Sequence, residues 1–312
     1  MKSQVTNLEE LLETNRTPGS RDIDPNRIRK AIVTGGDSGI GRYTAMALAE
    51  DGCDVAITWA HHEDDAKLTA KAIESFGRKA YIEKMDLNDP QAGVTSIDNM
   101  VEALGGLDIF VNNAGKMTKK VFPELELEDI QSQFAINTFG ATLAIQRASQ
   151  HMLGISDGIL PKQVAQILQQ ARKVIAGEIA SPRKTPGRII VVTSVHEHIA
   201  SPADTIYTMA KHALGGLIKS AAFSLAGTNV TINGVRPGEI ATPMNENHPE
   251  DCLDAKRKFI PGRRPGHPTE IASMIRYLAS DDSTYVNGMS YDVDGGMTIS
   301  TPMAMEGYQK LA

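Results

Sequence analysis

Apolar and polar positions follow a regular order along residues 30–298, where short β-branched runs alternate with longer amphipathic stretches. The apolar runs predict strands at 31–33, 54–58, 79–83, 107–111, 188–193, 229–235 and 289–293. Apolar residues at helical spacing predict helices at 43–50, 64–76, 90–104, 127–152, 205–225 and 268–279. Strands joined by helical crossovers lie parallel. The pattern therefore predicts an α/β fold, a single doubly wound domain with a seven-stranded parallel sheet and helices on both faces.

Composition indicates which kinds of molecule the protein binds and where it is found. The 312 residues carry a net charge of -6, with 41% hydrophobic and 22% charged residues, so we expect neither nucleic acid nor a membrane as a partner. Cys53 and Cys252 are too few for a disulfide framework, which favours a reducing compartment. No run is as long as a membrane span and the N-terminus has no apolar signal core, so we expect a cytoplasmic protein.

A glycine-rich turn joins the first predicted strand to the first predicted helix. Gly35, Gly39 and Gly41 are spaced so that three residues separate the first two and one residue separates the last two. Glycine lets the backbone approach a phosphate closely, and the amides and dipole of the following helix attract the anion. The turn by itself could be an ordinary tight connection, but its position predicts a dinucleotide site.

Polar residues follow several other strands, and the carboxyl ends of parallel strands meet at one edge of the sheet. Asp86 follows the third strand, where it can contact adenine or act as a turn residue, and 112–115 follow the fourth and line the cofactor channel. Ser194 ends the fifth strand, and Tyr207 and Lys211 lie four residues apart on one helix face. We expect the ammonium group to lower the tyrosine pKa, so that the phenol works as an acid and base, while the serine binds the substrate oxygen.

Together these residues resemble the short-chain dehydrogenase/reductase family over about residues 30–298. The matching positions are Thr34, Gly35, Gly39, Ile40, Gly41, Asp86, Asn112, Asn113, Ala114, Gly115, Asn137, Ser194, Tyr207, Lys211, Pro237 and Gly238. The resemblance implies a Rossmann-type domain and an NAD(P)-dependent oxidoreductase that interconverts a carbonyl and an alcohol by hydride transfer. It also implies that Tyr207 is the general acid and base, that Lys211 holds the nicotinamide ribose, and that Asn137 holds a water for proton relay.

The same resemblance implies a set of cofactor-binding residues: Gly35, Asp37, Ser38, Gly39, Ile40, Gly41, Thr58, Trp59, Asp86, Leu87, Asn113, Ala114, Gly115, Tyr207, Lys211, Pro237, Gly238, Ile240 and Thr242. NADP is preferred over NAD, because the second strand is followed by no acidic residue before Glu63. NAD stays open, because the arginine expected for NADP is also missing at Ser38. No metal is expected, since the histidines do not cluster with metal-ligand spacing.

The substrate is a small carbonyl compound or alcohol whose identity stays open. The segment 194–197, Ser-Val-His-Glu, resembles the glucose 1-dehydrogenase branch, and its His196 and Glu197 are either sugar ligands or an ordinary polar loop pair. A 3-oxoacyl carrier-protein reductase would need a basic docking patch, for which 256–258 and 263–264 are candidates, although a solvated face explains them equally simply. A non-catalytic dinucleotide-binding regulator is disfavoured by the complete catalytic set. The glycine spacing disfavours an epimerase or dehydratase.

Four segments lie outside the regular alternation. Residues 1–29 form an N-terminal extension, 301–312 a C-terminal tail, and 239–266 a long irregular stretch expected to be a substrate lid. Compared with the family, 151–187 is an insertion, and its 161–179 part predicts an extra amphipathic helix. We expect this helix to pack on the far edge of the domain or on a partner subunit, away from the active site. The family resemblance implies a homo-oligomer, a tetramer or dimer built through 127–152 and 205–225.

Overall fold

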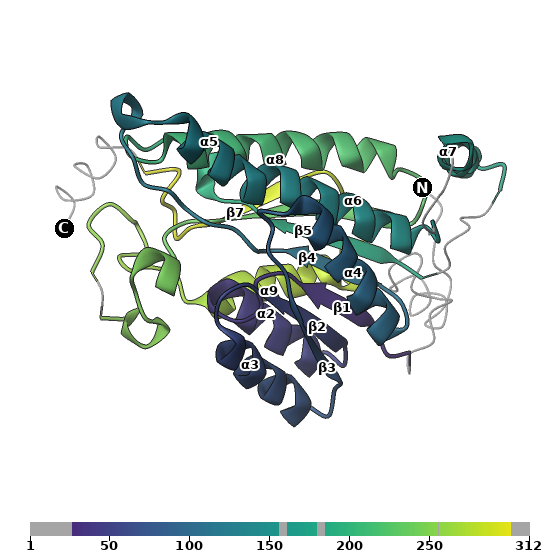
Figure 1. The fold of residues 1–312 in the computed structure, drawn as a ribbon, viewed down its shortest axis with the longest axis horizontal. Coiled ribbons are helices and arrows are strands. Elements are labelled where there is room, and N and C mark those ends of the chain that lie inside the picture. The colour runs from purple at the N-terminus through teal and green to yellow at the C-terminus, as the bar shows by residue number, and fades with distance from the viewer. Residues whose placement is uncertain (1–26, 156–160, 180–184, 255, 301–312) are drawn as a thin grey trace, which may run out of the picture.

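The computed structural model describes residues 27–155, 161–179, 185–254 and 256–300 (Figure 1). Nearly all of the predicted N-terminal extension and the whole C-terminal tail lie outside these residues. The domain, the irregular segment 239–266 and most of the insertion lie within them.

A seven-stranded parallel sheet forms the centre of the fold and confirms the predicted α/β class. Its strands are β1 (Lys30–Val33), β2 (Asp54–Trp59), β3 (Ala80–Lys84), β4 (Ile109–Asn112), β5 (Gly187–Val192), β6 (Val230–Pro237) and β7 (Ser290–Val293). They lie in the order β3-β2-β1-β4-β5-β6-β7. The chain therefore adds strands on one side of β1 up to β3 and then crosses to the other side at β4. Open α/β sheets bind their ligands at such a switch point between neighbouring strands.

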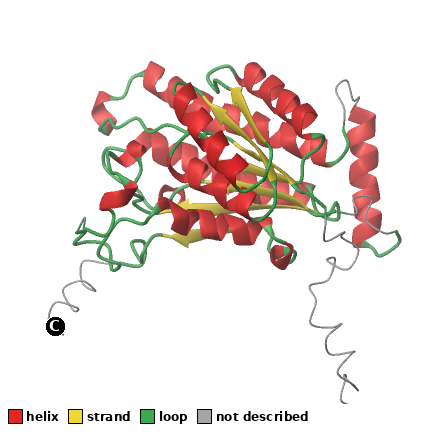
Figure 2. Cartoon of the chain, turned by 90° about the horizontal axis from the view of Figure 1, so that it is seen from below, coloured by secondary structure: helices red, strands yellow, loops and turns green. Residues whose placement is uncertain are grey.

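Helices cover both faces of this sheet (Figures 1 and 2). One face carries α2 (Gly39–Glu50), α3 (Glu63–Ser75) and α9 (Pro268–Ala279), and the other carries α4 (Pro90–Leu104), α6 (Ala141–Met152) and α8 (Thr205–Ser224). Successive residues of β1 alternate between two apolar cores, because Ala31 and Val33 pack on the α2 side and Ile32 on the α4 side. Burial on both faces explains why inner strands such as β1, β4 and β5 are largely apolar in the sequence.

The predicted helix 127–152 is interrupted, which corrects the sequence prediction. It consists of α5 (Leu127–Phe134), a π-helical segment Ala135–Gly140 and α6. Asn137 lies in the π-helical segment, and its amide binds both backbone groups of Lys116: Oδ1 accepts the N–H at 2.9 Å and Nδ2 donates to the carbonyl at 2.7 Å. This tertiary contact, which helical spacing does not encode, coincides with the widened turn.

The insertion contains α7 (Pro161–Ile175), at the end of the molecule opposite the 239–266 segment (Figure 1). The helix lies against the turn after α8: a Cβ on Gly227 would be 2.5 Å from the Ala171 carbonyl oxygen and 2.9 Å from Cγ1 of Ile175. Because α8 runs away from the carboxyl edge of the sheet, α7 lies at the amino edge. The side chains of Val164, Ile167 and Leu168 in the predicted apolar stripe are outside the described part.

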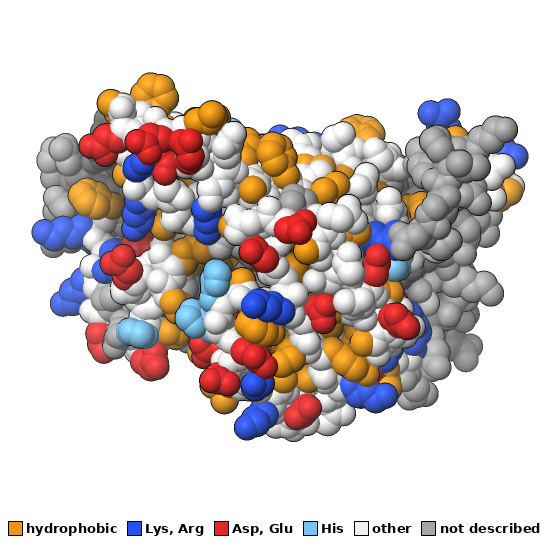
Figure 3. All heavy atoms as spheres, viewed as in Figure 1, with side chains coloured by type: hydrophobic (Ala, Val, Ile, Leu, Met, Phe, Trp, Pro, Cys, Tyr) orange, Lys and Arg blue, Asp and Glu red, His pale blue; other side chains and the backbone are white. Residues whose placement is uncertain are grey.

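Large apolar side chains remain exposed on α5, the π-helical segment and α8, including Leu127, Phe139 and Phe223. Figure 3 shows apolar side chains along this upper face of the molecule. Within the described residues, no helix has both the length and the apolar character needed to cross a membrane.

Candidate active site

Two adjoining cavities lie at the carboxyl edge of the sheet. One, of about 360 Å³, is lined by Ser194, Tyr207 and Lys211. The other, of about 330 Å³, is lined by the glycine turn and by residues after β2, β3 and β4. The residues that line both are Ile40, Asn113, Gly115, Thr242 and Met244. The two cavities are therefore parts of one groove. We call the cavity lined by Ser194, Tyr207 and Lys211 the catalytic cavity, and the one lined by the glycine turn the dinucleotide cavity.

The glycine turn presents the start of α2 to the dinucleotide cavity. Gly35 and Gly39 adopt left-handed backbone angles, with φ of 62° and 50°. The Gly35 N–H donates to Thr58 Oγ1 at 2.9 Å, which ties the turn to the end of β2. Ser38 precedes α2 without a side-chain cap, so the first amides of the helix are left for a ligand. Free amides at the positive end of a 12-residue helix fit the phosphates of a dinucleotide.

Asn113 holds the turn in place from β4. Its side-chain nitrogen donates to the carbonyl oxygens of Thr34 at 3.0 Å and Gly35 at 3.1 Å, while Thr34 Oγ1 accepts the N–H groups of Asn113 and Ala114. Gly41 has no space for a side chain, because a Cβ would lie 2.0 Å from the Gly35 oxygen and 2.6 Å from Asn113 Nδ2. Gly41 lines neither cavity, and it packs closely under the turn; its role in binding the cofactor stays a prediction.

The far end of the dinucleotide cavity brings together residues after β2 and β3. Thr58, Trp59, Asp86 and Leu87 line it, as do the predicted turn residues Asp37, Ser38, Gly39 and Ile40. The Lys84 ammonium lies 5.4 Å from the centre of the Trp59 ring. Burial raises the pKa of Asp37. His61 lines it as well, and the polar lining residues that were not predicted from the sequence include His62, Asn88 and Lys116.

Three polar side chains meet in the catalytic cavity. Ser194 lies two residues beyond the end of β5 and starts a short 3₁₀ helix, Val195–Glu197, where its Oγ accepts the His196 N–H at 3.2 Å. Tyr207 is 8% exposed in the first turn of α8 and lines the same cavity as Ser194. One turn later, Lys211 donates to the Val192 carbonyl at 3.0 Å, with its Nζ 5.4 Å from the centre of the Tyr207 ring.

Burial dominates the pKa values of Tyr207 and Lys211. Burial raises the pKa of Tyr207 to about 12; the hydrogen bond with Ser194 opposes the rise and the Asp204 carboxylate adds to it. Burial also lowers the pKa of Lys211 to about 8, against the opposing effect of Glu197. The Lys211 ammonium donates to the Val192 carbonyl, and the lowering of the Tyr207 pKa by Lys211 stays a prediction for the protein with a bound dinucleotide.

The remaining predicted site residues fall into two groups. Pro237, Gly238, Ile240 and Thr242 line the catalytic cavity beside Lys211. Asn137 lines neither cavity; it supports Lys116, which lines the dinucleotide cavity. Asn137 therefore affects the groove indirectly, by holding the backbone of Lys116 in place.

Comparison with known proteins identifies the relatives of this groove. A family model described as short chain dehydrogenase matches residues 29–160, and one described as enoyl-(acyl carrier protein) reductase matches 162–298. The chain belongs to the short-chain dehydrogenase/reductase family. It is 38% identical to an uncharacterized oxidoreductase, YohF, of Escherichia coli, over 87% of this chain and 96% of that protein. Two other relatives of this chain, to which it is 30% and 32% identical, are named glucose 1-dehydrogenase, from Gluconobacter oxydans, and 3-oxoacyl-[acyl-carrier-protein] reductase, from Synechocystis.

Solved structures agree with this membership. The crystal structure of acetoin dehydrogenase YohF from Salmonella typhimurium has a TM-score of 0.74 and 38% identity, covering 88% of this chain and 98% of that one. A short chain dehydrogenase from Burkholderia cenocepacia in complex with NADP has a TM-score of 0.71 and 29% identity, covering 86% and 98%.

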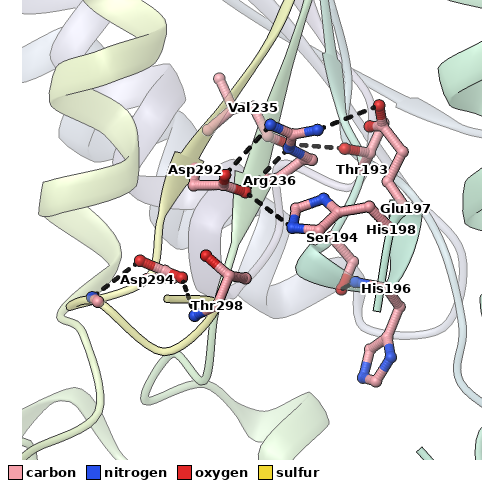
Figure 4. Close-up of polar contacts among 11 residues, drawn as sticks. Thr193, Ser194, His196, Glu197, His198, Val235, Arg236, Asp292, Asp294 and Thr298 are labelled. Atoms are coloured by element: carbon pink, nitrogen blue, oxygen red, sulfur yellow. Dashed lines mark hydrogen bonds and ion pairs between the residues drawn. The ribbon is translucent and has the colours of Figure 1, made fainter. Parts of the chain in front are cut away.

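In this short-chain dehydrogenase/reductase, His196 and Glu197 do not act as a pair. His196 lines the catalytic cavity, and its ring meets the Tyr207 ring edge-on at 5.7 Å. Glu197 is buried behind the cavity, 3.7 Å from Arg236, which also pairs with Asp292 at 2.9 Å (Figure 4). The predicted alternative of a joint sugar ligand therefore does not match the geometry. Lining residues that sequence reasoning missed include Met117, Lys119, Asp204 and Met297, whereas Met244 and Asn245 belong to the predicted lid segment 239–266.

The segment 239–266 borders the catalytic cavity through its first residues. Ile240 pairs with Gly266, so the two ends of the segment lie together. Arg257 pairs with Glu239 at 2.6 Å, and Arg264 pairs with Glu270 at 2.8 Å. Two cations of the candidate docking patch are therefore held by carboxylates of this chain.

Proposed function

We propose that this protein is an NAD(P)-dependent oxidoreductase that interconverts a small carbonyl compound and its alcohol, using Ser194, Tyr207 and Lys211. One observation carries the proposal: the three side chains meet in a cavity continuous with a groove lined by the uncapped start of α2. Membership of an oxidoreductase family supports it. A regulator that only binds a dinucleotide would not need Ser194, Tyr207 and Lys211 gathered in one cavity beside the groove.

The residues of the groove fit a nicotinamide dinucleotide. The first amides of α2 would take its phosphates, Asp86 and Leu87 its adenine, and Lys211 its ribose hydroxyls. When bound, the dinucleotide supplies or accepts the hydride at the substrate carbon. Asn137 would position the Lys116 backbone along its path.

Tyr207 and Ser194 handle the substrate oxygen. With a pKa of about 12, Tyr207 keeps its proton at neutral pH and is ready to donate it to a carbonyl oxygen. The Ser194 hydroxyl binds the same oxygen, so the developing negative charge meets two donors that are already in place. Lys211, with a pKa of about 8, is mostly charged at neutral pH and supports the phenol electrostatically.

We favour NADP over NAD as the cofactor. The end of β2 offers no carboxylate to the adenosine ribose, while His61, His62 and Lys84 lie near that end of the groove. The related dehydrogenase that binds NADP supports this preference. NAD remains the alternative because Asp37 also lines the cavity.

We further propose a cytoplasmic homo-oligomer, a tetramer or dimer. The exposed apolar side chains on α5 and α8, such as Leu127 and Phe223, lie on the two helices expected to pair. Sugar oxidation and 3-oxoacyl reduction are the alternative reactions, and both are represented among the named relatives.

The test combines binding with turnover. NADPH and NADH are titrated by the fluorescence of the reduced nicotinamide, and then ketones, aldehydes, sugars and acyl thioesters are assayed at 340 nm. Tyr207→Phe should lower kcat/KM about 10³-fold, because it removes only the proton donor, and change the Kd for NADPH less than about threefold. Tyr285→Phe, at a fully exposed tyrosine, is the control. Binding without turnover of any substrate, or a fully active Tyr207→Phe, would favour the regulator instead.

A further inference from the structure

A buried carboxylate lies behind the catalytic cavity, one helical turn from Lys211. Glu197 ends the short 3₁₀ helix that follows Ser194, and its side chain is 7% exposed. The carboxylate packs on Gly215 of α8, because a Cβ on Gly215 would be 2.6 Å from Oε1 of Glu197 and 2.7 Å from its carboxyl carbon. Tyr207, Lys211 and Gly215 are each four residues apart, so they share one face of the helix. Glu197 therefore lies beside the helix face that carries the tyrosine and the lysine.

The charge of Glu197 has only a distant partner on the sheet. Oε1 lies 3.7 Å from Nη1 of Arg236, and Oε2 is buried without a hydrogen bond in the described part of the chain. Arg236 is held more closely by Asp292, whose oxygens lie 2.9 Å from Nε and 3.1 Å from Nη2 (Figure 4). A buried carboxylate is costly unless a cation compensates it. Since Arg236 is shared with Asp292, Glu197 has charge left for a second cation.

The Lys211 ammonium is the cation on the other side of Glu197. Lys211 is 5% exposed, and its Nζ donates to the Val192 carbonyl at 3.0 Å. A buried ammonium loses its hydration, which favours the neutral amine. Burial lowers the pKa of Lys211 to about 8, and the Glu197 carboxylate opposes that fall.

Other titratable and charged groups surround this pair. Those that face Lys211 or Glu197, directly or through a shared partner, are Tyr207, His196, Asp204, Arg236, His198 and Asp292. Of the three carboxylates in this neighbourhood, only that of Glu197 acts on the pKa of Lys211.

We propose that Glu197 is a positioning residue that keeps the Lys211 side chain charged from behind the catalytic cavity. This inference rests on the proposed oxidoreductase function, in which the charged ammonium supports the phenol and binds the ribose hydroxyls. Glu197 lines neither cavity, so it acts on the reaction only through the lysine. The contact with Gly215 fixes the carboxylate at this place, because any larger residue there would displace it.

Two substitutions separate the charge of Glu197 from its packing. Glu197→Gln keeps the size of the side chain and removes its charge, whereas Glu197→Asp keeps the charge and removes one methylene group. In the unliganded protein labelled with ¹³C at lysine Cε, the Lys211 resonance is assigned by its loss in Lys211→Met and followed by NMR as the pH is varied. Glu197→Gln should lower the midpoint of this titration by at least about 0.5 pH units, because a nearby opposite charge favours the ammonium. Glu197→Asp should retain most of the wild-type midpoint.

Glu239→Gln is the matched control for removing a carboxylate from this region. Glu239 lines the catalytic cavity and is held by Arg257 at 2.6 Å. Its substitution should leave the midpoint of the Lys211 titration unchanged.

A pH profile connects this titration to the reaction. kcat/KM for reduction with NADPH should fall at high pH as Lys211 loses its proton, and in Glu197→Gln the fall should begin at a lower pH. An unchanged Lys211 midpoint or pH profile in Glu197→Gln, or an equal shift in Glu197→Asp, would overturn the role of Glu197 and leave the oxidoreductase intact. A shifted midpoint without turnover of any substrate would overturn the oxidoreductase and keep the coupling between Glu197 and Lys211.

Discussion

Replacing Gly41 by alanine tests whether the glycine turn is built as a close-packed phosphate site. The added Cβ would lie 2.0 Å from the Gly35 carbonyl oxygen. Ordinary contact begins near 3.4 Å, so either the turn or the start of α2 must move by roughly 1.4 Å. The same Cβ displaces Asn113 Nδ2, which holds that carbonyl in place.

The expected cost has two parts. Overpacking of this kind destabilises a fold by about 1–3 kcal/mol. Movement of the first amides of α2 also weakens the grip on phosphate, and a loss of about 1.4 kcal/mol corresponds to a tenfold higher Kd. Gly41→Ala should therefore lower the unfolding midpoint in urea and raise the Kd for NADPH at least about tenfold.

Gly52→Ala is the matched control at the other end of α2. Gly52 has a φ of 86° and no atom near its would-be Cβ, so alanine there adds only backbone strain of about 1 kcal/mol. The two variants should lose comparable stability, but only Gly41→Ala should lose dinucleotide affinity in calorimetric titrations. Wild-type NADPH binding by Gly41→Ala would refute the argument that this turn positions the phosphates.

Two further outcomes follow from burial and packing. The pKa of Lys211 is lowered to about 8, so the unfolded chain binds more protons than the folded one between pH 8 and the ordinary lysine pKa. The free energy of unfolding therefore rises with pH through that window, and Lys211→Met should lose this gain. Equal pH slopes in urea titrations of the two unliganded proteins would contradict the argument. Gly227→Ala should loosen α7, because its Cβ meets the Ala171 carbonyl, and should speed tryptic cleavage after Arg172, measured by mass spectrometry; Gly77→Ala, with a similar φ and open space, should not.

The sequence predicts the frame of this molecule well because the frame depends on local patterns. Strands buried on both faces must be apolar, and the helices between them carry amphipathic stripes. The spacing of Tyr207 and Lys211 follows from helical geometry, so their shared cavity could be expected as well.

Features that depend on tertiary contacts could not be predicted. The π-helical turn at Asn137 lies in a run with the apolar spacing of an α-helix, so the sequence pattern does not show it, nor the contact of Asn137 with the Lys116 backbone. The pKa of Tyr207 depends on burial by the whole fold. Asp204 appears in the sequence as an ordinary N-cap, and only the structure shows that it lines the catalytic cavity.

Trp59 gives the protein an internal optical reporter. It is the single tryptophan of the chain, and it lines the dinucleotide cavity with the Lys84 ammonium 5.4 Å from its ring centre. Its emission overlaps the absorption of reduced nicotinamide, so energy transfer from one known position can follow occupancy of the groove. Stopped-flow quenching of this one indole therefore gives association and release rates without any label.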